Sequence, residues 1–218
     1  MRRRTGNATI VVRSKKTVTG WQSLALPGAD VRLTTFCDAH STEVWRHRLH
    51  AEIPWERHRL KIFGRTLDAP RLSCWIGDAD ATYTYSRTRF VPHPWTPALS
   101  ELRRAVETMC DARFNSVLCN LYRDGNDAMG WHSDNEQELG EEPVIASLSF
   151  GATRRFRLRH RADPSQRLDI DLAAGSLLLM RGATQENYQH DLPRTKRIVG
   201  ERINLTFRLI HPRLSKSR

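Results

Sequence analysis

From Phe114 onward, the sequence alternates between apolar and polar residues in short runs, and this alternation constrains the fold more than any other feature. A period of two places successive side chains on opposite faces of a β-strand. We expect strands at 114–122, 144–150, 154–160, 168–172, 176–181 and 202–210. So many short strands, separated by turn residues such as Gly151 and Gly175, favour two packed antiparallel sheets, the double-stranded β-helix or jelly roll.

The part of the chain before Phe114 has apolar residues at helical spacing. We expect a helix at 42–52 and a second helix with Thr96 as its N-cap and Pro97 at its first position. The expected apolar faces are Val44, Trp45, Leu49 and Ile53 in the first helix and Leu99, Leu102, Val106 and Met109 in the second. Residues 58–66 alternate as a strand with a tight turn at Phe63-Gly64. The predicted class is therefore α+β, mainly β.

Basic residues are concentrated at the start of the chain. The net charge is +11, and residues 1–32 hold seven Lys or Arg against one Asp, which is +6. We interpret residues 1–35 as a basic, flexible arm, residues 36–212 as a single domain and residues 213–218 as a basic tail. The arm suits phosphate binding, an import presequence or simple solubilisation. The positive charge predicts a polyanionic partner.

The chain has neither an apolar run long enough to cross a membrane nor a signal-peptide pattern. We expect no membrane contact, a monomer and a cytoplasmic location, associated with the nucleoid if the source is bacterial. The four cysteines form no CxxC pair, so we expect reduced thiols without a chemical role.

His132-Ser133-Asp134 places an imidazole and a carboxylate two residues apart, so both can face one point on an extended segment. With the distant His190 they make two histidines and one aspartate, the set that binds non-haem Fe(II) as a facial triad and leaves three positions open. Taken singly, His132 or His190 is equally well explained as a surface or hydrogen-bonded histidine.

The segment Arg202-Ile-Asn-Leu-Thr-Phe-Arg208 alternates so that Arg202, Asn204 and Arg208 share one face. Two guanidinium groups suit a dicarboxylic acid, because arginine binds a carboxylate through two hydrogen bonds. Six residues span about 20 Å of strand, so the strand must curve or one side chain must reach back. An earlier strand adds Asn120 and Tyr122 on one face. The alternative is an ordinary half-buried strand with a solvated face.

Five segments resemble the AlkB family of nucleic-acid dealkylases, which depend on Fe(II) and 2-oxoglutarate. They are Asn120-Leu-Tyr-Arg-Asp-Gly125, Met129-Gly-Trp-His-Ser-Asp-Asn-Glu136, Ile145-Ala-Ser-Leu-Ser-Phe-Gly-Ala152, Phe156-Arg-Leu-Arg-His160 and Arg202-Ile-Asn-Leu-Thr-Phe-Arg208. The match runs from about Phe36 to Ile210 in the family's order. The segments are specific in combination, whereas each alone is weak.

The resemblance implies a role for each matching residue. The iron ligands would be His132, Asp134 and His190, and the 2-oxoglutarate residues would be Asn120, Tyr122, Arg202, Asn204 and Arg208. Arg202 would pair with the distal carboxylate, and Arg208 would lie beside the carboxylate next to the keto group.

The resemblance also implies substrate residues. Tyr85, with Tyr83 beside it, would stack on the damaged base, and Phe63-Gly64 would form the tip of a hairpin that displaces a base from a duplex. Arg71 would contact the DNA backbone. Packing is the alternative for Tyr83 and for the hairpin tip. Many relatives carry an acid where this chain has Asn135, although Glu136 is kept, so the base preference does not carry over.

The implied reaction is oxidative removal of N-alkyl groups from DNA bases such as 1-methyladenine and 3-methylcytosine, using O2 and 2-oxoglutarate on a flipped-out base. Arg155, Arg157 and Arg159 would hold phosphates. One alternative is an oxygenase of the same fold that acts on RNA, tRNA or protein side chains. The other is a nucleic-acid binder without activity, against which the complete set of iron and cosubstrate residues argues.

Overall fold

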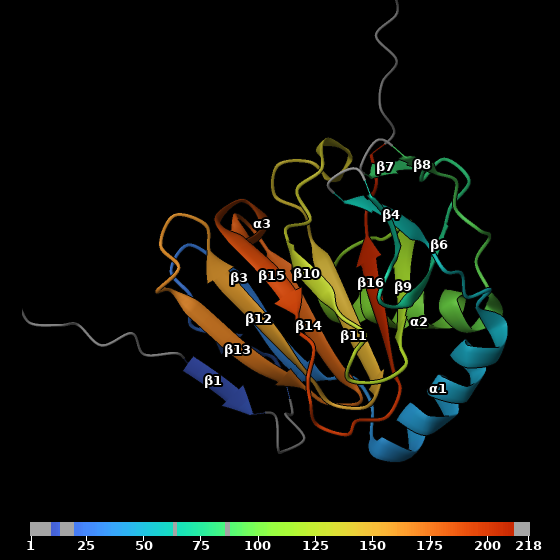
Figure 1. Cartoon of the computed structure of the whole chain (residues 1–218), viewed down its shortest axis with the longest axis horizontal. Helices are drawn as coiled ribbons and strands as arrows, with labels where there is room; N and C mark the ends of the chain where they lie inside the picture. The colour runs from blue at the N-terminus through green and yellow to red at the C-terminus, as the bar shows by residue number, and fades with distance from the viewer. Residues whose placement is uncertain (1–9, 14–19, 63–64, 86–87, 212–218) are drawn as a thin grey trace, which may run out of the picture.

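The computed structural model describes residues 10–13, 20–62, 65–85 and 88–211, and it is built on two β-sheets that face each other (Figure 1). Within these residues the larger sheet has seven strands, in the spatial order β2 (Gln22–Leu24), β3 (Asp30–Thr35), β14 (Ser176–Arg181), β11 (Ile145–Gly151), β16 (Arg202–Arg208), β9 (Ser116–Tyr122) and β6 (Leu72–Gly77). The smaller sheet has five, in the order β1 (Ile10–Arg13), β13 (Arg167–Leu172), β12 (Arg154–His160), β15 (Tyr188–Leu192) and β10 (Met129–His132). The predicted jelly roll is confirmed.

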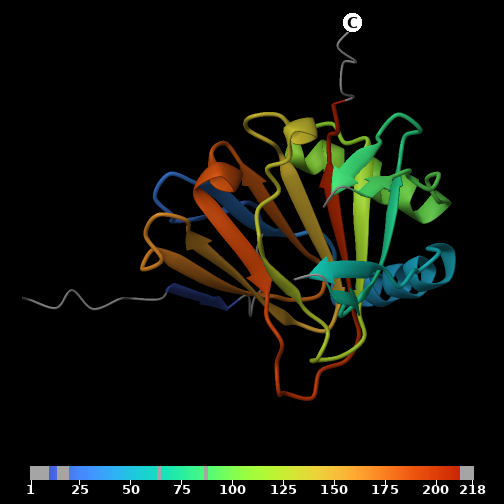
Figure 2. The same ribbon diagram turned by 45° about the horizontal axis from the view of Figure 1, so that its top comes forward.

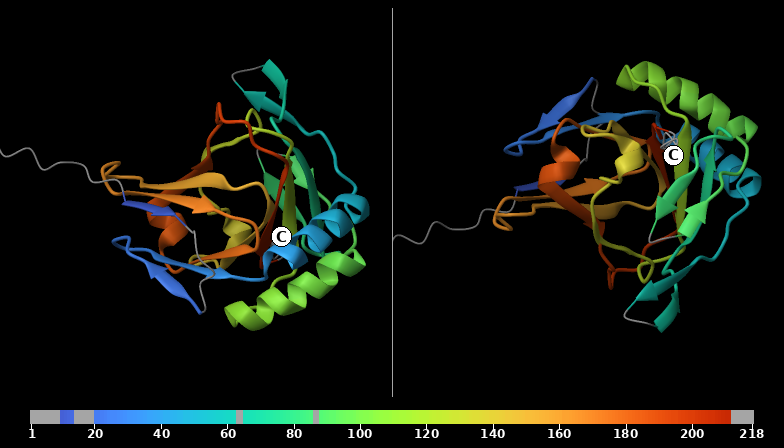
Figure 3. Two further views of the ribbon diagram at one scale, coloured as in Figure 1. Left: turned by 90° about the horizontal axis from the view of Figure 1, so that it is seen from below. Right: turned by 90° about the horizontal axis from the view of Figure 1, so that it is seen from above.

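The larger sheet is buried on both faces. In β14, Leu177 and Leu179 belong to the apolar core under the helices, whereas Leu178 and Met180 belong to the core between the sheets. Helices α1 (Ala39–Glu52) and α2 (Pro97–Cys110) lie side by side over the outer face (Figure 3). The helices therefore cover the outer face of the larger sheet. Its inner face, which points towards the smaller sheet, carries both apolar core residues and the polar residues that line the pocket.

Both long helices begin at residues that cap them. The Asp38 carboxylate accepts a hydrogen bond from the Ser41 N–H at 2.8 Å, and the Thr96 hydroxyl accepts one from the Leu99 N–H at 3.3 Å. The predicted start of α2 at Thr96-Pro97 is confirmed. The predicted apolar face of α1 is wrong at Val44, which is 48% exposed, because α1 turns only a narrow stripe that includes Leu49 towards the sheet.

The predicted arm boundary at residue 36 is wrong. Strand β3 pairs with β14 over six residues, and β2 pairs with β3. Val31 and Leu33 are each 1% exposed and fill the core between the sheets. The sequence pattern concealed this strand because Asp30 and Arg32, whose side chains pair at 2.8 Å, added charge to a segment already counted as basic. Residues 1–9, 14–19 and 212–218 of the predicted arm and tail lie outside the described residues.

Two hairpins project beside the edge strand β6 (Figure 2). The first joins β4 (Arg59–Ile62) to β5 (Arg65–Asp68), and the second joins β7 (Tyr83–Tyr85) to β8 (Thr88–Phe90). The backbone of Glu56 forms a bridge with Ser73, and that of His93 forms one with Ile76, so the base of each hairpin extends the sheet beyond β6. The predicted turn at Phe63-Gly64 lies outside the described residues.

Two short helical segments, η1 (Gln137–Leu139) and α3 (Thr184–Asn187), complete the described elements. No helix in the described part of the chain is both long enough and apolar enough to span a membrane.

Candidate metal and cosubstrate site

The pairing of β10 with β15 brings together the three predicted metal ligands. His132 and His190 are register partners across this pair, and Asp134 follows His132 just beyond the end of β10. One ligand atom from each side chain lies within 4.8 Å of the other two, and no other such group of three occurs among the described residues. The strand pairing thus brings the distant His190 to the His132-Ser133-Asp134 segment and completes the set of three ligands.

Neighbouring groups orient both histidines. His132 Nδ1 lies 2.8 Å from the Gly130 carbonyl oxygen, which can only accept, so Nδ1 carries the proton and Nε2 is left as the ligand atom. The His190 ring stacks on Phe156 at 5.2 Å between ring centroids. Burial, and next the nearby His132, lower the pKa of His190 to about 3. His190 is therefore a neutral imidazole, the form that binds a metal.

Asp134 has one oxygen in use and one free. Its Oδ1 accepts a hydrogen bond from Arg208 Nη2 at 2.8 Å, while Oδ2 is buried with no hydrogen-bond partner among the described residues. Burial is the largest single effect and opposes ionisation, but the charge and hydrogen bond of Arg208, together with His190 and His132, outweigh it and lower the pKa of Asp134 to about 2. A buried carboxylate oxygen without a donor among the described residues, beside His132 and the neutral His190, fits a divalent cation such as Fe(II).

The predicted cosubstrate residues lie on the larger sheet, which faces the smaller sheet that carries His132 and His190. Across β9 and β16, Asn120 is the register partner of Asn204, and Tyr122 is the partner of Arg202. One pocket is lined by the three ligands together with Asn120, Tyr122, Asn204 and Arg208. Of the two predicted cosubstrate arginines, Arg208 contacts Asp134 at the metal end, and Arg202 is the register partner of Tyr122.

Arg202 is a buried cation with free donors. It is 1% exposed, its Nη2 donates to the Ser149 hydroxyl at 3.0 Å, and its Nε and Nη1 have no hydrogen-bond partner among the described residues. Burial lowers its pKa to about 10, so it remains charged at neutral pH. Its guanidinium also lies 5.4 Å from the centre of the Tyr122 ring. A buried guanidinium with two free N–H groups fits a carboxylate, here the distal one of a diacid.

The sequence of this chain matches that of known oxygenases. The 2OG-Fe(II) oxygenase superfamily matches residues 31–208. The rat "Alpha-ketoglutarate-dependent dioxygenase alkB homolog 3" is 41% identical over 186 residues, which are 81% of this chain and 62% of that protein. The human "DNA oxidative demethylase ALKBH2" is 38% identical over 201 residues, which are 87% of this chain and 77% of that protein. The chain belongs to the AlkB family.

The solved structure of OsALKBH1 agrees with this chain in fold, with a TM-score of 0.60 over 87% of this chain and 100% of that one, at 16% identity. The AlkB-family chain described here spans about 62% of the length of the rat relative. Its superfamily implies Fe(II), 2-oxoglutarate and O2, and the triad and the buried Arg202 fit the first two of these.

The predicted substrate residues of this AlkB-family chain are placed only in part. Tyr83 and Tyr85 form the backbone of β7, but their side chains, together with Phe63 and Gly64, lie outside what the structure describes. Glu136 lies two residues beyond Asp134, and its buried Oε2 has no hydrogen-bond partner among the described residues. Asn135 is exposed.

The Arg71 side chain contacts the predicted cosubstrate residue Asn120. Its Nε donates to the Asn120 amide oxygen at 2.8 Å and its Nη1 to the Ala128 carbonyl oxygen at 3.4 Å. The side chain is half-buried beside the cosubstrate residues. The contact of Arg71 with the DNA backbone stays a prediction.

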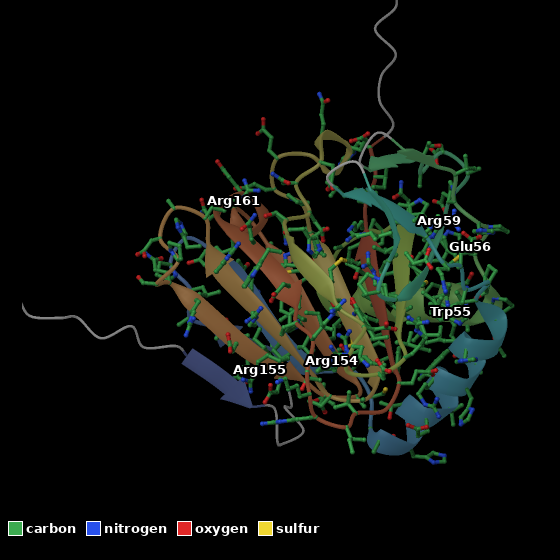
Figure 4. All side chains as sticks on the ribbon, in the orientation of Figure 1. Trp55, Glu56, Arg59, Arg154, Arg155 and Arg161 are labelled. Atoms are coloured by element: carbon green, nitrogen blue, oxygen red, sulfur yellow. The ribbon has the colours of Figure 1, made fainter. Side chains whose placement is uncertain are left out.

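The basic strand β12 is largely neutralised. Arg155 pairs with Asp171 at 3.0 Å, and Arg157 pairs with Asp191. Arg159 contacts only the neutral Gln189 oxygen, at 3.0 Å, and the ring of Trp131 at 4.0 Å. The exposed Arg161 follows the strand, and Figure 4 shows it at the opposite end of β12 from Arg154 and Arg155. Of the three predicted phosphate contacts on β12, only Arg159 has no carboxylate partner among the described residues.

Sequence reasoning missed the polar residues of β11. Asn204 Nδ2 donates to the Ser147 hydroxyl at 2.8 Å and to the Leu148 carbonyl oxygen at 3.0 Å, so both hydrogens of this predicted cosubstrate residue are used within the sheet. Ser149 contacts Arg202 in the same way. The signal was present, because Ser147 and Ser149 alternate with apolar residues, but their partners follow only from the register of β11 with β16.

Proposed function

We propose that this chain is an Fe(II)- and 2-oxoglutarate-dependent dioxygenase that removes N-linked alkyl groups from bases in DNA. One observation carries the proposal. A single pocket is lined by His132, His190 and Asp134, whose Oδ2 has no hydrogen-bond partner among the described residues. The same pocket is lined by Tyr122, and beside that ring lies the buried Arg202 with two N–H groups that have no partner there. The substrate class is taken from the relatives, because ALKBH2 proteins at 36–42% identity are named DNA oxidative demethylases.

The residues of the chain divide the work between the two ends of the pocket. His132 Nε2, Asp134 Oδ2 and His190 would hold Fe(II), which supplies the oxidising chemistry when bound. Arg208 keeps Asp134 ionised and fixes its orientation through Oδ1. Arg202 would bind the distal carboxylate of 2-oxoglutarate, next to the Tyr122 ring. The Phe156 ring stacks on the His190 ring and restricts its orientation.

A base must leave the stack to reach the pocket, and Tyr85 on β7, with Tyr83 beside it, would receive it. A positively charged base such as 1-methyladenine would be attracted to such a ring by cation–π interaction. Glu136 would contact the edge of the base, and Arg159 and Arg161 would hold phosphates near the open end of the smaller sheet. We further propose that the chain acts as a monomer in the cytoplasm, which size-exclusion chromatography and localisation of the tagged full-length protein would test.

The test is a turnover assay with Fe(II), 2-oxoglutarate and ascorbate on oligonucleotides that contain 1-methyladenine or 3-methylcytosine. Single- and double-stranded DNA and single-stranded RNA of the same sequence are compared, and mass spectrometry follows loss of the methyl group. The expected result is demethylation of DNA that requires 2-oxoglutarate and is absent in Asp134→Ala. Faster turnover of RNA than of DNA would replace DNA by RNA as the substrate, and no 2-oxoglutarate-dependent demethylation of any oligonucleotide would reject the function.

A further inference from the structure

Arg71 lies at a junction of three parts of the molecule. It follows the β4–β5 hairpin and directly precedes β6. Its backbone neighbour Pro70 accepts a hydrogen bond from the Ala128 N–H at 2.9 Å, and the Ala128 carbonyl in turn accepts one from the Arg71 guanidinium. Ala128 immediately precedes β10, the strand that carries the metal ligand His132. The Arg71 side chain is thus held against the interior, with its Nε 2.8 Å from the Asn120 oxygen.

The contact with Arg71 determines which way the Asn120 amide faces. A guanidinium can only donate hydrogen bonds, so the atom of Asn120 next to it must be the amide oxygen. The NH2 group then points away from Arg71 and is the group that the amide offers to the pocket that Asn120 lines. A carboxylate can only accept. An amide turned the other way would present its oxygen to the carboxylate and repel it.

We propose that Arg71 is a positioning residue for the cosubstrate, which fixes Asn120 as a hydrogen-bond donor towards 2-oxoglutarate, and that it does not hold the nucleic-acid backbone. This role rests on the cosubstrate assignment made under the proposed function. It also links the stem of the first hairpin to the cosubstrate pocket through one side chain. The rival role, a phosphate contact, would have to use the guanidinium N–H groups that are not directed at Asn120 and Ala128.

The experiment measures binding of 2-oxoglutarate by calorimetry to the Mn(II)-loaded protein in the absence of nucleic acid. Arg71→Met should weaken this binding at least about tenfold, the scale of one lost hydrogen bond to a charged group. The matched control is Arg59→Met, on strand β4 of the same hairpin. The Arg59 side chain (Figure 4) is 76% exposed and forms an ion pair with Asp68 at 3.6 Å, so its loss should leave the dissociation constant unchanged.

A double-mutant cycle separates action through Asn120 from a general loss of structure. In the Asn120→Ala background, Arg71→Met should weaken 2-oxoglutarate binding by less than about twofold, because the group that it positions is gone. Additive losses would overturn the proposal, since a disordered pocket or an independent contact would produce them. If Arg71→Met does not fold, Arg71→Lys, which retains a donor, enters the same cycle and should show a smaller loss that again vanishes without Asn120.

The rival role gives the opposite result. An unchanged affinity of Arg71→Met for 2-oxoglutarate, with weaker binding of DNA, would assign Arg71 to the phosphates and overturn the proposal. Failure of the demethylation assay would not affect the calorimetry, which contains no nucleic acid. A wild-type protein that binds no 2-oxoglutarate would overturn both this inference and the proposed function.

Discussion

The two oxygens of Asp134 have different partners, and this division decides how the metal end of the pocket works. Arg208 occupies Oδ1 and the other oxygen is free. A cation bound at Oδ2 therefore does not have to displace a hydrogen bond, and the aspartate is already oriented before the metal arrives. Preorganised ligands bind more tightly because less freedom is lost on binding.

Replacement of any one metal ligand should abolish metal binding and turnover while the fold persists. The variants are His132→Ala, Asp134→Ala and His190→Ala, each of which removes one of only three protein ligands. Titration with Mn(II) followed by calorimetry measures the binding, and circular dichroism measures the fold. His47→Ala, an exposed histidine on α1, is the control and should bind Mn(II) as the wild type does. Folded ligand variants with wild-type turnover would disprove the metal assignment.

The two cosubstrate arginines should fail in different ways. Arg202→Leu should weaken 2-oxoglutarate binding by on the order of 2–5 kcal/mol, the scale for one partner of a buried charge pair, without changing Mn(II) affinity in the absence of 2-oxoglutarate. Arg208→Leu should weaken both, because Arg208 also holds Asp134. Two calorimetric titrations per variant check this. Loss of Mn(II) affinity in Arg202→Leu would contradict the division of the pocket into two ends.

At the scale of single elements, β3 is the strand whose position the sequence did not reveal. It pairs with the edge of β14 opposite to β11, and its Leu33 side chain is 1% exposed. Leu33→Ala should lower the free energy of unfolding by about 2–5 kcal/mol, the range for buried leucines. Val44→Ala on α1 is the matched control: Val44 was predicted to be buried but is 48% exposed, so its loss should cost within about 0.5 kcal/mol. Urea unfolding of the two variants distinguishes them, and equal values would contradict the assignment of residues 30–35 to the sheet.

The tip of the first hairpin gives a prediction on substrate preference. If Phe63 wedges into a duplex when a base leaves the stack, Phe63→Ala should lower activity on double-stranded DNA and spare single-stranded DNA, where no stack needs replacing. Stability should hardly change. If Phe63 instead packs inward, the same change should cost roughly 3–5 kcal/mol and reduce both activities together. Parallel assays on the two substrates, with a melting curve, separate these outcomes.

The sequence predicted the strands and helices that carry strong local patterns, and it predicted the site residues through motifs. Strand β16 and the start of α2 at Thr96 are examples. It did not predict β10 or β15, because each is short and carries functional polar residues in place of an alternating apolar face. Nor could it predict that Arg71 contacts Asn120, since that contact depends on the pairing of β6 with β9 and on the path of a loop.

At the scale of the whole molecule, the net charge of +11 overstates the positive surface of the smaller sheet. Arg155 and Arg157 form ion pairs with Asp171 and Asp191, which lie on neighbouring strands. These ion pairs reduce the positive charge that the smaller sheet presents to a polyanion. The contribution of each arginine to binding therefore depends on whether a carboxylate already faces it.

The salt dependence of DNA binding tests this distribution of charge. Arg159→Gln should reduce the slope of log K against log salt concentration by about 1, because one phosphate contact is lost. Arg155→Gln, the matched control four residues away on the same face of β12, should leave the slope nearly unchanged, since its charge is already balanced by Asp171. Fluorescence anisotropy at several salt concentrations measures both slopes. Equal reductions would show that the ion pair with Asp171 opens when DNA binds.

The position of β16 has a consequence for the newly made protein. This strand comes last among the described elements, yet it lies in the middle of the larger sheet, between β11 and β9 (Figure 1). Until it leaves the ribosome, the sheet is divided into a part ending at β11 and a separate pair, β9 with β6. Arg202 and Arg208 both belong to β16, so before this strand is made Asp134 lacks its ionic partner Arg208. A chain that ends before β16 therefore lacks both the arginine that orients Asp134 and the buried arginine beside Tyr122, so the complete site can form only after this strand has been made.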